Sequence, residues 1–195
     1  MHALLVIDVQ RDFCPGGALA VSGGDEIING INITMDKFDA VILTQDWHPE
    51  KHSSFASTHS AEPFSMTEMS YGPQVLWPDH CIQNSSGAAF HPDLRLDGDL
   101  IIRKGYNPTI DSYSAFFEND KSTPTGLEGY LRTRGIKAVT LVGLATDYCV
   151  AYSGLDARKL GFDVTVKLDL CRAIDMGGSL KASTDSMSAA GIKLV

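Results

Sequence analysis

The sequence predicts an α/β fold, a single-domain three-layer α/β/α sandwich around a doubly wound, mainly parallel sheet of six strands. Short apolar runs alternate along the chain with stretches of helical spacing. The runs are continuous and rich in Val, Ile and Leu, which is typical of parallel strands buried on both faces. At 195 residues, one domain covering 1–195 can build a core of the required size.

The first half of the chain predicts two strands, one helix and a long irregular region. Ala3–Val9 and Ala40–Thr44 are continuous apolar runs, and the intervening Asp25–Lys37 has apolar residues at helical spacing. From residue 45 to residue 98 the chain is rich in Pro, His, Ser and Trp, without sustained periodicity. A loop this long inside a compact domain is usually functional, so we expect part of a site there.

The second half predicts strands and helices in alternation. Gly135 and Gly161 are stop signals after two of the helices. The predicted strands are Leu100–Arg103, Ala138–Val142, Asp163–Leu168 and Ile192–Val195, and the predicted helices are Pro124–Arg134, Tyr148–Leu160 and Ser179–Ala190.

Right-handed crossovers between these strands give the sheet order 3-2-1-4-5-6. Ligands bind such sheets beyond the carboxyl ends of the strands, where strands 1 and 4 lie side by side. Asp8 ends the first strand, Lys104 follows the third and Cys149 follows the fourth. We therefore expect these three side chains in one crevice. The turn Asp8–Gly17 has no G-x-G-x-x-G pattern, which argues against a dinucleotide-binding dehydrogenase.

Composition narrows the choice of partner and compartment. The formal net charge of −8 argues against nucleic acid or an anionic membrane as partner. No apolar run reaches membrane-spanning length, and the N-terminal run lacks a secretory leader pattern. Cys14, Cys81, Cys149 and Cys171 are scattered without zinc-finger or disulfide spacing, so we expect a cytoplasmic protein. A homo-oligomer is compatible with this composition.

The segment Ala138–Val150 predicts a strand, a turn and the start of a helix. Thr146 or Asp147 could cap that helix, which would place Cys149 in its first turn. Aligned peptide dipoles there favour the thiolate, so we expect a lowered pKa for Cys149 and a nucleophilic role. The alternative is a buried cysteine with a purely structural role.

Asp8 and Lys104 can complete a catalytic unit with this thiol. The ammonium group of Lys104 would stabilise the thiolate, and Asp8 would take the thiol proton and return it to a leaving group. The alternatives are a turn-capping aspartate and a solvated lysine at a strand end.

A second set of residues has the chemistry of metal ligands. Asp46 and His48 stand two apart, so they share one face of an extended segment, and His80 adds a second imidazole. This donor set suits zinc, iron(II) or manganese. His52 is a possible additional ligand, and a hydrogen-bonded loop pair is the alternative reading of Asp46 and His48.

Three aromatic residues fall in loops beside these groups rather than at core spacing. Phe13, Trp77 and Tyr113 could stack against a flat, mostly apolar substrate, or simply pack within the loops.

Together these motifs resemble the isochorismatase-like cysteine hydrolase superfamily, and within it the nicotinamidase/pyrazinamidase branch. The resemblance covers nearly the whole chain, and the order of its motifs is highly specific. They are Leu5–Phe13, Thr44–Pro49, Trp77–Cys81, Arg103–Gly105, Asp111–Phe116 and Gly143–Cys149.

The resemblance implies an amidohydrolase that converts nicotinamide to nicotinate and ammonia through a thioester, with pyrazinamide as an analogue substrate. Cys149 would be the nucleophile, Asp8 the proton shuttle and Lys104 the group that stabilises the thiolate. It further implies a cis peptide between Leu144 and Ala145 and an oxyanion site made by the N–H groups of Ala145 and Cys149.

The resemblance also assigns the remaining candidates. One divalent metal ion, zinc as the first expectation with iron or manganese as alternatives, would orient the pyridine ring. The implied ligands are Asp46, His48 and His80, with His52 possible, and the implied substrate contacts are Phe13, Trp77 and Tyr113.

Three other functions fit parts of this pattern. A different small-amide hydrolase or an isochorismatase-type enzyme would share the fold and the thiol, but such relatives generally lack the Asp-x-His…His set. A zinc hydrolase that uses metal-bound hydroxide would not need Cys149. A metal- or redox-responsive binding module, with Cys149 as a sensor thiol, would leave the Asp8–Lys104–Cys149 unit unexplained.

Overall fold

A computed structural model describes all residues of the chain, Met1–Val195. Its main sheet has six parallel strands in the order β5-β2-β1-β6-β7-β8, which is the predicted order 3-2-1-4-5-6. The predicted fold class is therefore confirmed. The strands are β1 His2–Ile7, β2 Ala40–Asp46, β5 Leu100–Lys104, β6 Ala138–Leu144, β7 Asp163–Arg172 and β8 Lys193–Leu194.

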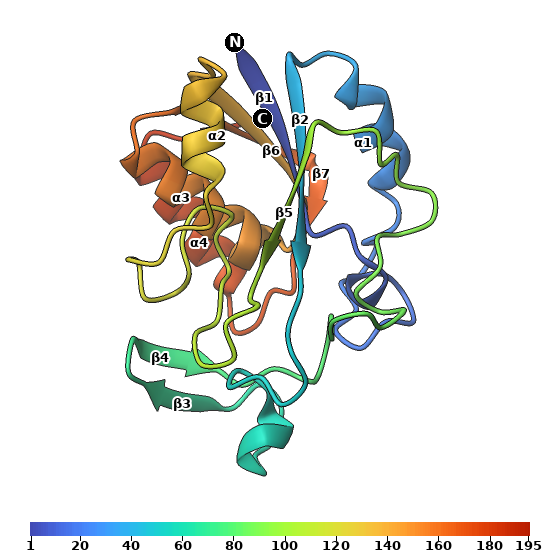
Figure 1. Cartoon of the computed structure of the whole chain (residues 1–195), viewed down its shortest axis with the longest axis vertical. Helices are drawn as coiled ribbons and strands as arrows, with labels where there is room; N and C mark the ends of the chain where they lie inside the picture. Colours follow the sequence, from blue (N-terminus) through green and yellow to red (C-terminus); the bar gives the residue numbers. More distant parts are fainter.

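Helices cover both faces of this sheet (Figure 1). Right-handed crossovers place α1 on one face, because the chain steps from β1 to β2 in one direction. The steps from β5 onward run the opposite way, so α2, α3 and α4 lie on the other face. None of the helices is long and apolar enough to cross a membrane. Their bounds are α1 Ile28–Met35, α2 Leu127–Thr133, α3 Ala151–Lys159 and α4 Ser179–Ala189.

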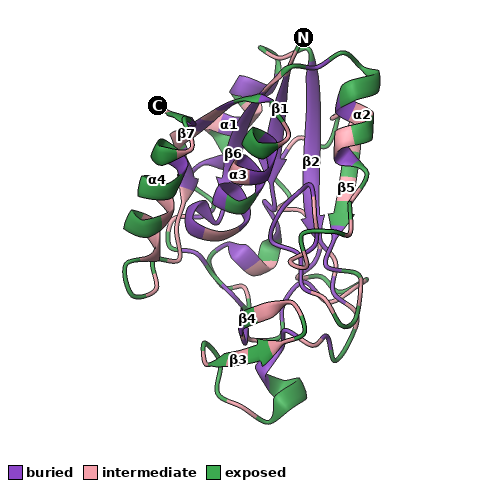
Figure 2. Cartoon of the chain, turned by 90° about the vertical axis from the view of Figure 1, so that its left-hand side faces the viewer, coloured by how far each residue is buried: buried purple, intermediate pink, exposed green.

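The central strands are buried on both faces (Figure 2). Every residue of β2 is buried, as are all residues of β1 and β6 except the first of each. Their continuous apolar runs have this burial pattern because helices and loops cover both faces of the sheet. The edge strand β5 instead alternates between exposed and half-buried residues up to Lys104, which is fully buried.

Several boundaries differ from the sequence-based prediction. Strand β2 continues two residues past Thr44, because Gln45 and Asp46 pair with Arg103 and Lys104 of β5. The predicted helix over 25–37 begins only at Ile28, since the residues before it form successive turns. The predicted helix over 148–160 is also divided. A π-helical turn, η3 (Thr146–Val150), precedes α3.

The long region 45–98 contains a hairpin that was not predicted. Strands β3 (Met66–Met69) and β4 (Gly72–Val75) pair antiparallel, and a short 3-10 helix, η2 (Ala56–His59), precedes them. The strand β3 alternates only between exposed and half-buried residues, so it has no apolar face that periodicity could reveal. Hairpin and η2 lie beyond the carboxyl ends of β2 and β5 (Figure 1).

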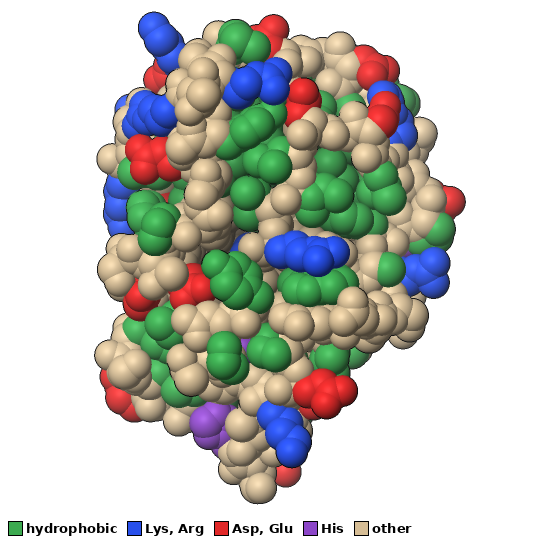
Figure 3. Space-filling model, viewed as in Figure 1, with side chains coloured by type: hydrophobic (Ala, Val, Ile, Leu, Met, Phe, Trp, Pro, Cys, Tyr) green, Lys and Arg blue, Asp and Glu red, His purple; other side chains and the backbone are tan.

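Basic and acidic side chains are scattered over the face seen in Figure 3, with apolar side chains between them. Hydrophobic residues that remain exposed include Phe64 and Met66 at the hairpin, and Ile101 and Tyr106 at and after β5.

Gly143 provides a test of how tightly the central strands pack. It has a φ of +115° and pairs with Ile7, and a Cβ added there would collide with the main chain of Ile7. We predict that Gly143→Ala lowers the free energy of unfolding by about 3 kcal/mol or more, because a left-handed backbone and a buried clash act together. Urea denaturation followed by circular dichroism measures this.

The matched control is Gly161, which also has a positive φ (+85°) but has nothing within 4 Å of an added Cβ. Gly161→Ala should cost only the backbone penalty, about 1–2 kcal/mol. Equal losses in the two variants would contradict the packing argument.

Candidate active site

The carboxyl ends of three strands bring together the side chains predicted to form a catalytic unit. Asp8 directly follows β1 with a φ of +47°, Lys104 is the last residue of β5, and Cys149 lies in η3 after β6. Asp8 and Lys104 are fully buried and Cys149 is 7% exposed. The expected crevice is therefore present at the switch point of the sheet.

Lys104 is the centre of this group. Its Nζ lies 2.8 Å from Asp8 Oδ2, 2.5 Å from Asp46 Oδ1 and 3.4 Å from Cys149 Sγ, and it donates to Ser112 O at 3.0 Å. Burial lowers the pKa of Lys104, but Asp46 and Asp8 together raise it well above its usual value. The lysine therefore remains an ammonium ion in contact with the thiol.

Thr44 orients the carboxylate of Asp8. Its hydroxyl donates to Asp8 Oδ1 at 2.6 Å, and its Oγ1 accepts from the Asp8 N–H at 3.1 Å. The other carboxylate oxygen, Oδ2, faces Lys104 and accepts no well-directed hydrogen bond. Asp8, Asp46 and Cys149 have acceptor atoms within 4.8 Å of one another, so Oδ2 is available to exchange a proton with the thiol.

The pKa of Cys149 runs against the sequence-based prediction. Burial raises it well above the usual value, and the opposing effect of Lys104 does not compensate. Burial also raises the pKa of Asp8, with Lys104 opposing. The prediction of a lowered thiol pKa considered only the helix terminus and not the complete desolvation of the site. Burial thus favours the neutral thiol, so a base beside Cys149 would assist formation of the nucleophile.

Next to this group lie the three predicted metal ligands. Asp46 is the last residue of β2, and its Oδ2 lies 3.6 Å from His48 Nε2 and 3.8 Å from His80 Nε2. The potential ligand atoms of the three residues lie within 4.8 Å of one another, and all three are buried. Burial favours the neutral carboxyl, but Lys104 and His48 hold the pKa of Asp46 well below its usual range.

The hydrogen bonds of the two imidazoles fit a bound cation. His48 Nδ1 lies 2.9 Å from Gly105 O, and His80 Nδ1 lies 2.7 Å from Pro78 O. Because a carbonyl oxygen only accepts, each Nδ1 donates a proton, so each Nε2, beside Asp46, is the nitrogen that the neutral ring would offer to a cation. Carbonyl groups fix metal-bound histidines in this way. Gly105, with a φ of +69°, permits the contact, since a Cβ there would collide with the His48 ring.

His52 is not brought into this set. Its Nε2 is hydrogen-bonded to Asn107 O at 2.7 Å, its Nδ1 lies 2.8 Å from Ser54 Oγ, and its ring packs on His48 at 4.5 Å between centroids. It groups with His48 and Asp111 rather than with Asp46 and His80. Both of its nitrogens already have partners, so it supports His48 by packing.

The predicted aromatic residues line one apolar pocket above the thiol. Trp77 Nε1 donates to Tyr113 OH at 3.0 Å, and Gln74 Nε2 also donates to this hydroxyl at 2.8 Å. Ala145 also lines the pocket, and the peptide bond between Leu144 and Ala145 is cis. The full lining is Phe13, Leu19, Asp46, Trp77, His80, Asp111, Tyr113, Ala145, Tyr148, Cys149 and Ile174.

Four of these lining residues were not predicted as site residues. Tyr148 is adjacent to Cys149, a position that could have identified it. Asp111 lies in a motif that resembles the family. Leu19 and Ile174 carry no sequence signal, since they are ordinary apolar residues that the loops after β1 and β7 bring to the pocket.

Asp147 holds the loop that carries Ile174. The prediction that Thr146 or Asp147 caps the helix is wrong, because neither side chain makes a capping hydrogen bond. The buried carboxylate of Asp147 instead accepts from Ile174 N at 3.1 Å, Asp175 N at 2.8 Å and Ser179 Oγ at 2.5 Å. It therefore ties the turn that contains the nucleophile to the loop that carries the pocket residue Ile174.

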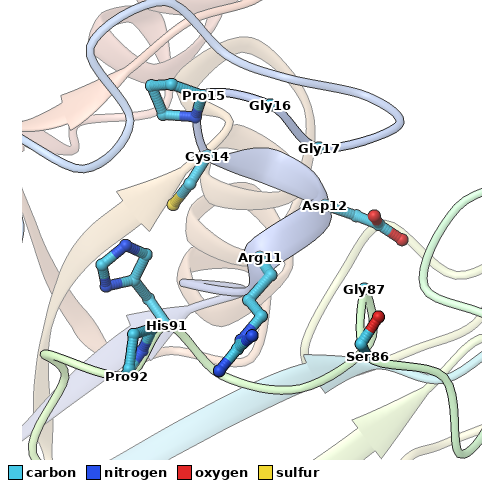
Figure 4. Close-up of a pocket in the computed structure, with 10 residues that line it drawn as sticks. All are labelled: Arg11, Asp12, Cys14, Pro15, Gly16, Gly17, Ser86, Gly87, His91 and Pro92. Atoms are coloured by element: carbon cyan, nitrogen blue, oxygen red, sulfur yellow. The ribbon is translucent and has the colours of Figure 1, made fainter.

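A second, wider hollow of about 390 Å³ shares the short 3-10 helix η1 (Arg11–Phe13) with this pocket (Figure 4). Arg11, Asp12 and Cys14 line the hollow, whereas Phe13 lines the pocket above the thiol. Burial, and after it the negative charge of Asp25, raise the pKa of Cys14 to about 11, and neither cause favours the thiolate. The hollow therefore lacks the nucleophilic chemistry of the pocket.

Comparisons with known proteins agree with this arrangement. The isochorismatase domain family matches residues 2–195. The chain belongs to this family. A curated nicotinamidase of Acinetobacter baylyi is 52% identical over 195 residues, covering 99% of this chain and 91% of the relative.

Solved structures of this isochorismatase family superimpose closely on the chain. The nicotinamidase/pyrazinamidase of Acinetobacter baumanii has a TM-score of 0.98 at 52% identity and covers 100% of this chain and 95% of its own. An L. infantum protein in complex with nicotinate has a TM-score of 0.88 at 39% identity, and the match covers 100% of this chain and 92% of that protein. The pyrazinamidase of Pyrococcus horikoshii in complex with zinc has a TM-score of 0.81 at 38% identity, and the match covers 100% of this chain and 98% of that protein.

The hydrogen bonds of Asp147 predict a local effect of its substitution. Asp147→Asn keeps one oxygen but turns an amide N–H₂ toward groups that donate, so we expect a loss of about 1–3 kcal/mol of stability. Amide exchange at Ile174 and Asp175 should accelerate more than exchange in the central strands. Hydrogen–deuterium exchange with mass spectrometry measures both regions.

Asp185 is a suitable control, because it is exposed and pairs only with Lys181 on α4. Asp185→Asn should leave exchange of the Ile174 loop unchanged. Unchanged exchange in Asp147→Asn as well would show that the carboxylate does not hold the loop.

Proposed function

We propose that this chain hydrolyses nicotinamide to nicotinate and ammonia, with pyrazinamide as an analogue substrate. The observation that carries the proposal is the contact of Cys149 with Lys104 and Asp8 in an aromatic-lined pocket beside an Asp–His–His group. The relatives named as nicotinamidases and the L. infantum structure with nicotinate support this substrate.

The reaction begins with proton transfer from the thiol. Asp8 Oδ2 takes the proton of Cys149, and the sulfur attacks the carboxamide carbon to form a tetrahedral intermediate. The ammonium group of Lys104, 3.4 Å from Sγ, stabilises the negative charge as it forms on sulfur. The N–H groups of Ala145 and Cys149 would donate to the oxygen that becomes an oxyanion.

The intermediate then loses ammonia. Asp8 returns its proton to the amide nitrogen as the C–N bond breaks, which leaves a thioester on Cys149. A water molecule gives a proton to Asp8 and attacks the thioester carbon, and the C–S bond breaks. Asp8 then returns this proton to the departing sulfur, and the carboxylic acid product loses its own proton to solvent, so the products are nicotinate and the regenerated thiol. Asp8 thus alternates between base and acid.

We infer that Asp46, His48 and His80 hold one divalent metal ion, without His52. Zinc fits the oxygen-and-imidazole donor set and is the metal in the Pyrococcus horikoshii relative, while iron or manganese would fit the same donors. When bound, the metal acts as an electrophilic anchor for the pyridine nitrogen and orients the ring. Phe13 and Trp77 would flank the pyridine ring. Tyr113 would lie beside this ring, held by the hydrogen bond that its hydroxyl accepts from Trp77 Nε1.

We further propose that residues 1–195 act as one catalytic domain whose region 45–98 supplies part of the metal site. A cytoplasmic location fits the four free cysteines, which a reducing compartment would maintain. The scattered exposed apolar side chains are compatible with a homo-oligomer.

The first test is ammonia release from nicotinamide by the wild type and by Cys149→Ala. We expect the substitution to lower kcat by about a thousandfold or more, since it removes the nucleophile. Cys171→Ala, which changes another buried cysteine, is the control and should retain activity. If Cys149→Ala stays active, a hydroxide mechanism replaces the thiol mechanism. If the folded, metal-loaded wild type releases no ammonia, the substrate assignment is wrong.

A second test removes the metal. Dialysis against a strong chelator should raise KM and lower kcat, because the ring is no longer oriented over the thiol. Addition of zinc, iron(II) or manganese should restore activity to different degrees. Retention of full activity by protein shown to be metal-free by elemental analysis would contradict the inferred metal role.

A further inference from the structure

We infer that Gln10 is a positioning residue that fixes the metal ligand Asp46 through its main chain. The inference rests on the proposed metal site at Asp46, His48 and His80. Gln10 is fully buried just after β1, and it touches none of the reacting groups assigned above.

The amide of Gln10 makes a paired contact with one residue. Its Oε1 accepts from the Asp46 N–H at 2.8 Å, and its Nε2 donates to Asp46 O at 2.8 Å. Nε2 also donates to Ala88 O at 2.8 Å, so both of its protons and the oxygen are used. The side chain therefore has one available orientation.

The Gln10 amide takes the place of main-chain pairing that β1 does not provide at Asp46. Strand β1 pairs with β2 only as far as Val6 and Leu43, because the chain turns away at Asp8. Asp46 is held on its other side by β5, through pairing with Lys104. Without Gln10, the N–H and C=O of Asp46 that face β1 would have no partner in a buried site. The glutamine amide supplies both bonds that a neighbouring strand would have supplied.

Gln10 is itself held by its main chain. Its N–H donates to Asp8 O at 2.8 Å, and Gln10 forms an isolated bridge with Phe90. The contact therefore links the backbone of the proposed proton shuttle to the backbone of the proposed metal ligand. A loss of the amide would free the end of β2 and let the Asp46 carboxylate move relative to His48 and His80.

The adjacent Gln45 offers a matched control. Its side chain is also buried and also donates to Ala88 O, at 2.9 Å, but it makes no hydrogen bond to the main chain of Asp46. Its Oε1 accepts from Arg103 Nε at 3.1 Å. Gln45→Met and Gln10→Met thus remove an amide of the same type that binds the same carbonyl, and only the second releases Asp46.

The test measures metal affinity directly by competition with a chromophoric chelator, using zinc as the probe. We expect Gln10→Met to weaken zinc binding by about 10-fold to 100-fold, as for other residues that orient metal ligands. Gln45→Met should bind zinc as the wild type does. The cobalt(II)-loaded protein should show an altered visible absorption spectrum in Gln10→Met alone, since that spectrum reports ligand geometry.

Activity gives a second readout. Excess zinc should restore much of the kcat of Gln10→Met. Without metal, the thermal unfolding temperature of Gln10→Met should be lower than that of the metal-free wild type. If Gln10→Met does not fold, Gln10→Glu replaces it in the test. This variant keeps the acceptor for the Asp46 N–H but loses the donors to Asp46 O and Ala88 O. Its zinc affinity should lie between that of the wild type and that expected for Gln10→Met.

The outcomes separate this inference from the proposed function. A wild type that binds no zinc would overturn the metal site itself. A wild type that binds zinc, with Gln10→Met and Gln45→Met weakened equally, would overturn only the role of Gln10, because the effect would then come from the shared bond to Ala88.

Discussion

Lys104 holds a positive charge where water does not reach, and two carboxylates and a thiol surround it. Each of these charges would be costly to bury alone, by several kcal/mol. Asp8 follows β1, Asp46 ends β2 and Lys104 ends β5, and these strands are neighbours in the sheet. The same ion pairs therefore hold three strand ends together and join the proposed nucleophile centre to the proposed metal site.

Much of the fold could be predicted from the sequence, because continuous apolar runs and right-handed crossovers leave few topologies open. The same logic predicted that Asp8, Lys104 and Cys149 would meet, since residues after parallel strands lie at one edge. The end of β2 was harder to predict, because Gln45 and Asp46 are polar. Only their pairing with β5 extends the strand.

What the sequence did not reveal depends on contacts between distant segments. The carboxylate of Asp147 binds a loop 27 and more residues away, so local pattern suggested a helix cap instead. The predicted shift of the Cys149 pKa had the wrong direction, because burial, a property of the whole fold, outweighs the local helix dipole. Leu19 and Ile174 reach the pocket only through loop conformation.

The segment between β2 and β5, which contains the hairpin, supplies a different set of pocket residues from the sheet strands. The groups proposed for bond breaking sit at the ends of sheet strands, whereas Trp77 and His80 come from this segment. Exchange of this segment would therefore alter the aromatic wall of the pocket and remove His80 from the proposed metal site, without changing the sheet residues that position Asp8, Lys104 and Cys149.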